Sequence, residues 1–111
     1  MSKDPQILER IYQTILSRKN ANPQTSYTAS LFSAGLDTII DKVAEESSET
    51  LAAANSESQK ALIFESADLL FHLMILWAVK DIEPDEVFVE LSRREGTSGL
   101  VEKASRKNSD K

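Results

Sequence analysis

The sequence predicts an all-α protein, and three observations support this fold class. Only three glycines and three prolines interrupt its 111 residues. Long stretches are rich in Ala, Leu, Glu, Lys and Gln, which favour helix. Apolar residues recur at three- and four-residue spacing, the pattern of an amphipathic helix. We therefore expect a four-to-five-helix bundle-like fold, formed by a single domain over residues 1–96.

Residues that start or break helices set the expected boundaries; they are Asp4, Pro5, Pro23, Gly35, Ser58, Pro84 and Gly96. Helices are expected at 5–19, at about 29–54 with a break at Gly35, at about 58–80 and at 84–94, with a polar loop at 20–30. The basic tail, residues 97–111, is expected to be mobile unless a ligand orders it.

The third helix is unusually apolar, and this predicts a homodimer. Of the 19 residues from Ala61 to Val79, 15 are apolar. A helix that is apolar nearly all round lies inside a bundle or spans a membrane. Its two acids and one histidine argue against a membrane span. A chain of this length supplies few neighbours for such a helix, so we expect homodimerisation to complete the bundle.

Composition and charge exclude several kinds of site and partner. There is no cysteine and only one histidine, so disulfides, thiolate sites and multi-histidine sites are excluded. A metal would need oxygen ligands, which suit Mg²⁺ or Mn²⁺. The net charge of −5 argues against a nucleic-acid partner. The first residues lack the apolar run of a signal peptide, so a cytoplasmic location is expected.

Two acidic pairs carry the candidate chemistry. Glu46 and Glu49 lie three residues apart on the second predicted helix, and Glu65 and Asp68 lie three apart on the third. This spacing places both members of a pair on one helix face. Two antiparallel helices joined by a short turn can then present four carboxylates to one divalent cation.

The two pairs differ in how well a structural role explains them. Glu46 and Glu49 fit an ordinary solvated face equally well, since Lys42 lies four residues before Glu46. Glu65 and Asp68 sit among apolar residues, with no Lys or Arg between 61 and 79 to neutralise them. Burying unpaired carboxylates costs several kcal/mol, and a shared cation is the simplest compensation.

Two further features allow more than one interpretation. His72, one turn after Asp68, fits a hydrogen-bonded core histidine better than a ligand. Arg93 and Arg94 fit two roles equally: they complement the dipole at a helix C-terminus, or they contact a substrate phosphate.

At these residues the sequence resembles a known family. The pattern Glu-x-x-Glu, fifteen residues, then Glu-x-x-Asp is similar to the metal signature of the MazG-type all-α nucleotide pyrophosphohydrolases. Four stretches narrow the resemblance to the phosphoribosyl-ATP pyrophosphohydrolase family: 26–28, 42–49, 65–73 and 98–106. The resemblance runs from about Ile7 to Arg106. Ala44 stands where the family pattern has glycine, and no fused cyclohydrolase domain is seen, as in the stand-alone form.

The resemblance implies Mg²⁺-dependent hydrolysis of phosphoribosyl-ATP to phosphoribosyl-AMP and pyrophosphate, the second step of histidine biosynthesis. It implies a cation held by Glu46, Glu49, Glu65 and Asp68. Glu45 is our candidate for activating the water, with Glu49 also assigned to catalysis. The candidate phosphate contacts are Lys42, Arg93, Arg94, Lys103 and Arg106.

Two alternatives stay open. The same chemistry fits a house-cleaning nucleoside triphosphate as substrate, which a substrate panel would reveal. The second alternative is a non-catalytic helical dimerisation module with buried acids. It predicts that the thermal stability does not depend on a metal ion.

Overall fold

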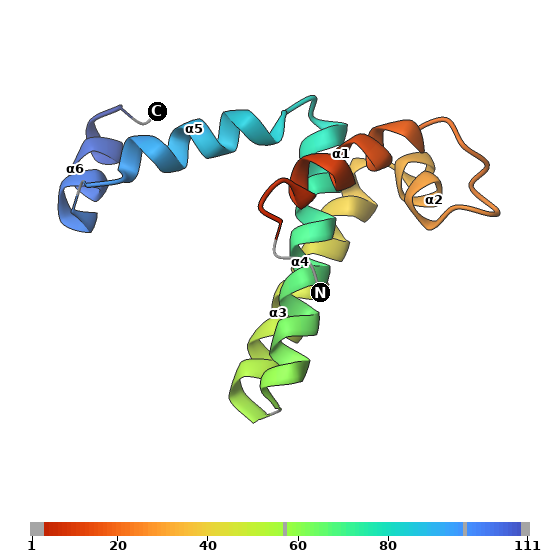
Figure 1. Ribbon diagram of the computed structural model, residues 1–111, viewed down its shortest axis with the longest axis horizontal. Helices are drawn as coiled ribbons and strands as arrows, with labels where there is room; N and C mark the ends of the chain where they lie inside the picture. Colours follow the sequence, from red (N-terminus) through yellow and green to blue (C-terminus); the bar gives the residue numbers. More distant parts are fainter. Residues whose placement is uncertain (1–3, 57, 97, 110–111) are drawn as a thin grey trace.

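The computed structural model describes residues 4–56, 58–96 and 98–109, and within them it is all-α, without strands, as predicted. Six helices follow one another in these residues: α1 (Ile7–Ser17), α2 (Tyr27–Ala34), α3 (Leu36–Ser56), α4 (Gln59–Val79), α5 (Pro84–Arg94) and α6 (Gly99–Ser109). Helices α3 and α4 form a long antiparallel hairpin; α1 and α2 lie near one end of it, and α5 and α6 extend away to the side (Figure 1).

The predicted loop at 20–30 is wrong for its last four residues, which belong to α2. The Ser26 side chain caps this helix by accepting a hydrogen bond from the Ala29 amide at 3.1 Å. The predicted break at Gly35 is confirmed. Its φ of 101° is a conformation that glycine adopts at little cost, and it lets α2 and α3 run in different directions.

The residues expected to start α4 and α5 do so, whereas α1 begins at Ile7 after Gln6 and not at Pro5. Ser58 accepts a hydrogen bond from the Ala61 amide at 3.1 Å and starts α4. Pro84 opens α5, where Glu83 and Glu86 form a capping box. The basic tail contains the helix α6 from Gly99, and its expected mobility stays a prediction. The start of the helix has a local cause, since the Ser98 hydroxyl accepts from the Val101 amide at 3.1 Å. Thr97, at the predicted domain boundary, lies outside the described residues.

The core lies where α1, α2 and α3 meet the C-terminal half of α4. It contains Tyr12, Ile15, Leu31, Ile39, Met74, Ile75 and Ala78. The Tyr12 hydroxyl donates a 2.6 Å hydrogen bond to the Ile82 carbonyl, which ties α1 to the connection between α4 and α5. This core anchors one end of the α3–α4 hairpin and so fixes the register of the two helices.

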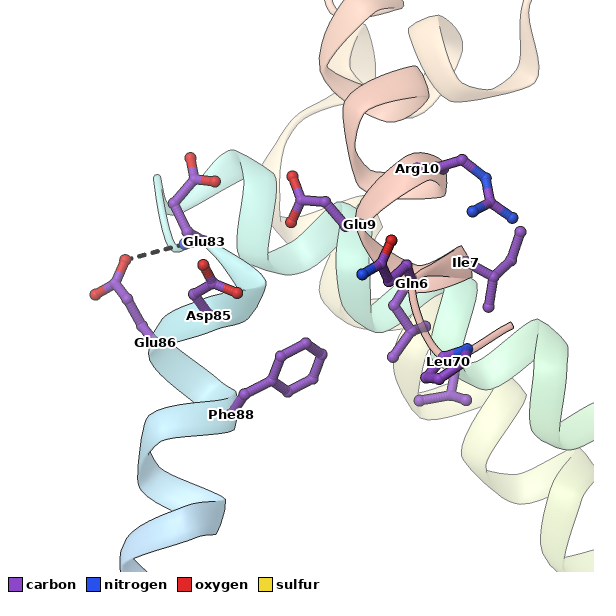
Figure 2. A pocket seen from close by; sticks show the side chains of 11 residues that line it. Gln6, Ile7, Glu9, Arg10, Leu70, Glu83, Asp85, Glu86 and Phe88 are labelled. Atoms are coloured by element: carbon purple, nitrogen blue, oxygen red, sulfur yellow. Dashed lines mark hydrogen bonds between the residues drawn. The ribbon is translucent and has the colours of Figure 1, made fainter. Parts of the chain in front are cut away.

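Helix α5 packs against the start of α1, and an open groove remains between them (Figure 2). Helix α4 is long and apolar enough to cross a membrane by length and composition, a test that the central helix of a soluble protein also passes.

Candidate metal and active site

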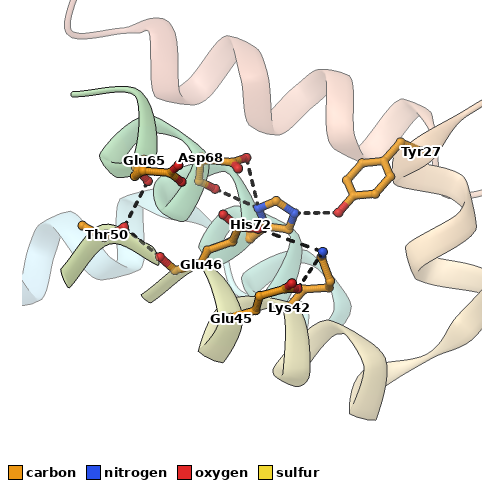
Figure 3. Close-up of polar contacts among 8 residues, drawn as sticks. All are labelled: Tyr27, Lys42, Glu45, Glu46, Thr50, Glu65, Asp68 and His72. Atoms are coloured by element: carbon orange, nitrogen blue, oxygen red, sulfur yellow. Dashed lines mark hydrogen bonds and ion pairs between the residues drawn. The ribbon is translucent and has the colours of Figure 1, made fainter. Parts of the chain in front are cut away.

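The α3–α4 hairpin brings the four predicted carboxylates together. Glu46 and Glu49 come from α3, and Glu65 and Asp68 come from α4. Ligand atoms of Glu46, Glu49 and Glu65 lie within 4.8 Å of one another, and those of Glu46, Asp68 and His72 do the same. Glu46 belongs to both groups and is the centre of the cluster. Figure 3 shows Glu46, Glu65 and Asp68 converging from the two helices.

Glu46 is the carboxylate of this cluster whose surroundings most favour a positively charged partner. Glu46 is 5% exposed, and its Oε1 atom is buried without a hydrogen-bond partner among the described residues. Burial, together with the hydrogen bond and negative charge of Asp68, raises the pKa of Glu46 to about 7. A buried carboxylate beside other carboxylates is therefore protonated in part at neutral pH unless a positive charge joins it.

This raised pKa predicts how the stability of the metal-free protein depends on pH. Between pH 4.5 and 7 the folded state holds a proton on Glu46 that the unfolded state releases. The free energy of unfolding therefore falls as the pH rises through this window. We expect the thermal midpoint in EDTA to drop between pH 5.5 and pH 8, and Glu46→Gln to flatten the profile. Equal slopes for both proteins would contradict this assignment.

Lys42 and Glu45 lie at the open edge of the cluster. The Lys42 Nζ atom is 2.8 Å from Glu45 Oε1 and 4.0 Å from Glu46 Oε2. The ion pair with Lys42 lowers the pKa of Glu45, so this exposed carboxylate is ionised at neutral pH. Glu45 can accept a proton there, although its lowered pKa makes it a weaker base than an unpaired glutamate.

His72 is the buried, hydrogen-bonded histidine that the sequence favours. It is 3% exposed, and its Nδ1 atom lies 2.8 Å from the Asp68 backbone carbonyl. Because that atom faces acceptors, Nδ1 carries the proton, and Nε2 accepts a 2.8 Å hydrogen bond from the Tyr27 hydroxyl. Both nitrogens are in use, so His72 fixes the Asp68 turn of α4 against α2 and is not available as a ligand.

Two residues of the site had no recognised role in the sequence. Tyr27, predicted to lie in a loop, starts α2 and holds His72. The Thr50 Oγ1 atom lies 2.7 Å from the Glu46 backbone carbonyl and 3.2 Å from that of Glu65. It links α3 to α4 at the level of the carboxylates. An isolated tyrosine in a polar stretch is a weak signal for such a role, and the threonine gives none.

The other predicted phosphate contacts are not brought to the cluster within one chain. Arg93 and Arg94 lie at the end of α5 and pair with Glu90. Lys103 and Arg106 lie on α6. Figure 1 shows α5 extending away from the end of the α3–α4 hairpin, with α6 beyond it. We call α5 and α6 together the arm.

The carboxylates fit a hard divalent cation by the chemistry of their donors. Three carboxylate side chains, those of Glu49, Glu65 and Asp68, surround Glu46 and offer oxygen ligands. One of the Glu46 oxygens is buried without a partner in the part of the chain described. Mg²⁺ and Mn²⁺ prefer oxygen ligands. The fold and site together define an all-α protein with a carboxylate cluster of this type between two antiparallel helices.

Comparison with known proteins places the chain more narrowly. The model of the phosphoribosyl-ATP pyrophosphohydrolase family matches residues 8–95. Curated relatives named phosphoribosyl-ATP pyrophosphatase include one from Trichlorobacter lovleyi, 51% identical over 96% of this chain and 99% of its own. Another, from Paramagnetospirillum magneticum, is 51% identical over 96% and 97% of the two chains. The chain belongs to the phosphoribosyl-ATP pyrophosphohydrolase family, so the resemblance seen in the sequence is confirmed.

Proposed function

We propose that this protein is a cytoplasmic, Mg²⁺-dependent phosphoribosyl-ATP pyrophosphohydrolase that acts in histidine biosynthesis. The observation that carries the proposal is the buried, partly unpartnered Glu46 at the centre of four carboxylates, in a chain of this family. In the reaction, water adds across the bond between the α- and β-phosphates of the substrate. The products are phosphoribosyl-AMP and pyrophosphate.

Glu46, Glu49, Glu65 and Asp68 are the residues that would hold the cation, with Mn²⁺ as a possible substitute for Mg²⁺. When bound there, the cation neutralises phosphate charge and lowers the pKa of a coordinated water. Glu45, ionised through its pair with Lys42, is our candidate for taking the proton of the attacking water. Lys42 lies at the same edge and can turn from Glu45 to a substrate phosphate.

The basic residues of the arm need a partner subunit to take part. These residues lie at the end of α5 and on α6, and both helices extend away from the α3–α4 hairpin of their own chain (Figure 1). They are Arg93, Arg94, Lys103 and Arg106. We propose that they contact the triphosphate bound at the cluster of the other subunit in a homodimer. Charged donors aimed at the leaving pyrophosphate stabilise the charge that develops on it.

The direct test is a pyrophosphate-release assay with phosphoribosyl-ATP, ATP and the deoxynucleoside triphosphates, each with and without Mg²⁺. We expect Mg²⁺-dependent release with a clear preference for phosphoribosyl-ATP. A preference for a free deoxynucleoside triphosphate would assign a house-cleaning role instead.

Metal binding also predicts a change in stability that needs no substrate. A cation that binds only the native state raises the free energy of unfolding, by about 2.7 kcal/mol when its concentration is 100 times its dissociation constant. The thermal midpoint rises with it. We expect MgCl₂ to raise the midpoint at pH 8, and Glu49→Gln to reduce the shift. Equal midpoints with MgCl₂ and EDTA would support a non-catalytic helical module.

A further inference from the structure

A pocket between α1 and the start of α2 has no role in the proposed chemistry. Its volume is about 480 Å³, within the 300–1,000 Å³ that is usual for small-ligand sites. Its walls come from the second half of α1, from the chain just before α2, from the first residues of α2 and from Phe71 of α4. A pocket of this size can hold a group as large as a sugar phosphate.

The side chains that line this pocket favour a polar anion. Apolar residues, among them Ile15 and Phe71, form one part of the lining. The other part carries hydroxyl groups, among them those of Thr14 and Thr25, and the guanidinium of Arg18. None of the described side chains in this lining is acidic, in a chain whose net charge is −5. The groove between α1 and α5, by contrast, is lined by several acidic residues.

Arg18, which directly follows α1, has a guanidinium that is available to a ligand. It is exposed, and among the described residues its side chain makes no hydrogen bond or ion pair. Two other basic residues of this segment are paired. Arg10 binds Asp4, and the Lys19 Nζ atom lies 3.8 Å from Asp81 Oδ1. A guanidinium binds phosphate through two parallel hydrogen bonds, so Arg18 suits a phosphate group held in the pocket.

The pocket lies next to the carboxylate cluster, because two of its lining residues contact His72. The rings of Tyr27 and Phe71 have their centroids 5.8 Å and 5.5 Å from that of His72. The Nδ1 atom of His72 lies 3.5 Å from Asp68 Oδ1. Figure 3 shows Tyr27 reaching His72 from one side and Asp68 from the other. Since Tyr27 is 52% exposed, one long ligand can cross its ring and reach both the pocket and the cluster.

Phosphoribosyl-ATP is a ligand with phosphate at both ends. Its triphosphate lies on one side of the adenine, and a second ribose 5-phosphate is attached at N1 on the other. We propose that the pocket binds this N1-linked phosphoribosyl group, with Arg18 contacting its 5-phosphate. The Thr14 hydroxyl donates to the Arg10 carbonyl at 3.1 Å, which leaves its oxygen able to accept from a ribose hydroxyl. The assignment rests on the proposed function and extends it, because this group distinguishes the substrate from ATP.

The first test is the KM of Arg18→Ala for phosphoribosyl-ATP. Losing hydrogen bonds to a charged group should raise KM by about 10-fold to 100-fold. The value of kcat should stay close to wild type, because the contact is remote from the bond that breaks. The inhibition constant of ATP, which lacks the phosphoribosyl group, should not change. Arg18→Lys should recover part of the loss, since lysine keeps the charge without the planar fork.

Arg10→Ala is the matched control, because Arg10 is an exposed arginine of α1 outside the lining of this pocket. Its KM should stay at the wild-type value. Wild-type turnover combined with an unchanged KM in Arg18→Ala would overturn the assignment of the pocket alone. An equal loss of affinity for ATP would overturn it too, because Arg18 would then act on the triphosphate. A wild type that releases no pyrophosphate from phosphoribosyl-ATP would overturn the proposed function as well.

The second test measures binding without turnover or metal. The isotope-labelled full chain is titrated with ribose 5-phosphate in EDTA and followed by its amide NMR signals. We expect saturable shifts at Thr14, Arg18 and Thr25, with little change at Glu46 and Glu49. Ribose without the phosphate should bind far more weakly, and Arg18→Ala should remove the shifts caused by ribose 5-phosphate. Saturable shifts confined to other parts of the chain, or none at all, would overturn the proposal.

Discussion

Asp68→Asn is expected to reduce turnover of phosphoribosyl-ATP by about 100-fold or more while the fold stays intact. The substitution keeps the size of the side chain and removes one negative charge from the proposed cation site. Even residues that only support a metal ligand cost about 10–100-fold when changed, so the loss of a ligand should cost at least as much. The measurement is pyrophosphate release at saturating Mg²⁺.

The stability of this variant separates a chemical role from a structural one. Asp68 raises the pKa of Glu46 through its charge and hydrogen bond, so the two carboxylates repel each other when both are ionised. Removing this repulsion should leave the metal-free thermal midpoint at pH 8 equal or higher. The increase in midpoint on adding MgCl₂ should shrink. A structural role alone would instead lower the midpoint in EDTA.

Asp41→Asn is the matched control, because Asp41 is an exposed acid on α3 outside the cluster. The same change of acid to amide should leave both turnover and the Mg²⁺-induced shift close to wild type. Full activity in Asp68→Asn would rule out Asp68 as a necessary ligand and would weaken the assignment of the whole cluster.

The all-α fold and the acidic cluster could be predicted because local signals in the sequence determine them. Ser58 and Gly35 fix where α4 begins and where α2 ends. Glu65 and Asp68 stand out because they lie in an apolar helix without a Lys or Arg between residues 61 and 79 to neutralise them. Once α3 and α4 are joined by a short turn, the spacing of the acids brings Glu46 to Asp68.

The remaining features depend on contacts between segments distant in sequence. The hydrogen bond between Tyr27 and His72 joins residues 45 positions apart, and no local sequence pattern predicts this pairing. The polar residues before α2 predict a loop up to Ser30, so the sequence does not predict the first turn of this helix. The separation of Arg93 and Arg94 from the carboxylates depends on the direction in which α5 leaves α4, which no local pattern fixes.

That separation leads to the second large effect, recovery of activity in a hybrid dimer. One subunit carries Asp68→Asn, which inactivates its own cluster but leaves its arm intact. The other carries Arg93→Ala, Arg94→Ala, Lys103→Ala and Arg106→Ala, which leave its cluster intact. Each variant alone should be at least about 100-fold less active than wild type, because Asp68→Asn removes a proposed cation ligand and the other variant removes charged donors to the transition state.

The two chains are co-expressed with different tags, and the hybrid is isolated by sequential purification on both. If the arm acts on the partner's cluster, one of the two sites in the hybrid has both intact parts. We therefore expect about half of the wild-type activity per dimer. If the arm acts within its own chain, each site keeps one defect and the hybrid stays inactive.

The two variants, each measured as a homodimer, are the controls for the hybrid. A hybrid as inactive as its parents would overturn the role of the arm in the partner's site. A fully active four-substitution variant would show that the arm does not contact the substrate at all. Because the arm extends away from the α3–α4 hairpin that carries the carboxylates (Figure 1), we expect recovery in the hybrid. It would make the dimer a requirement for catalysis.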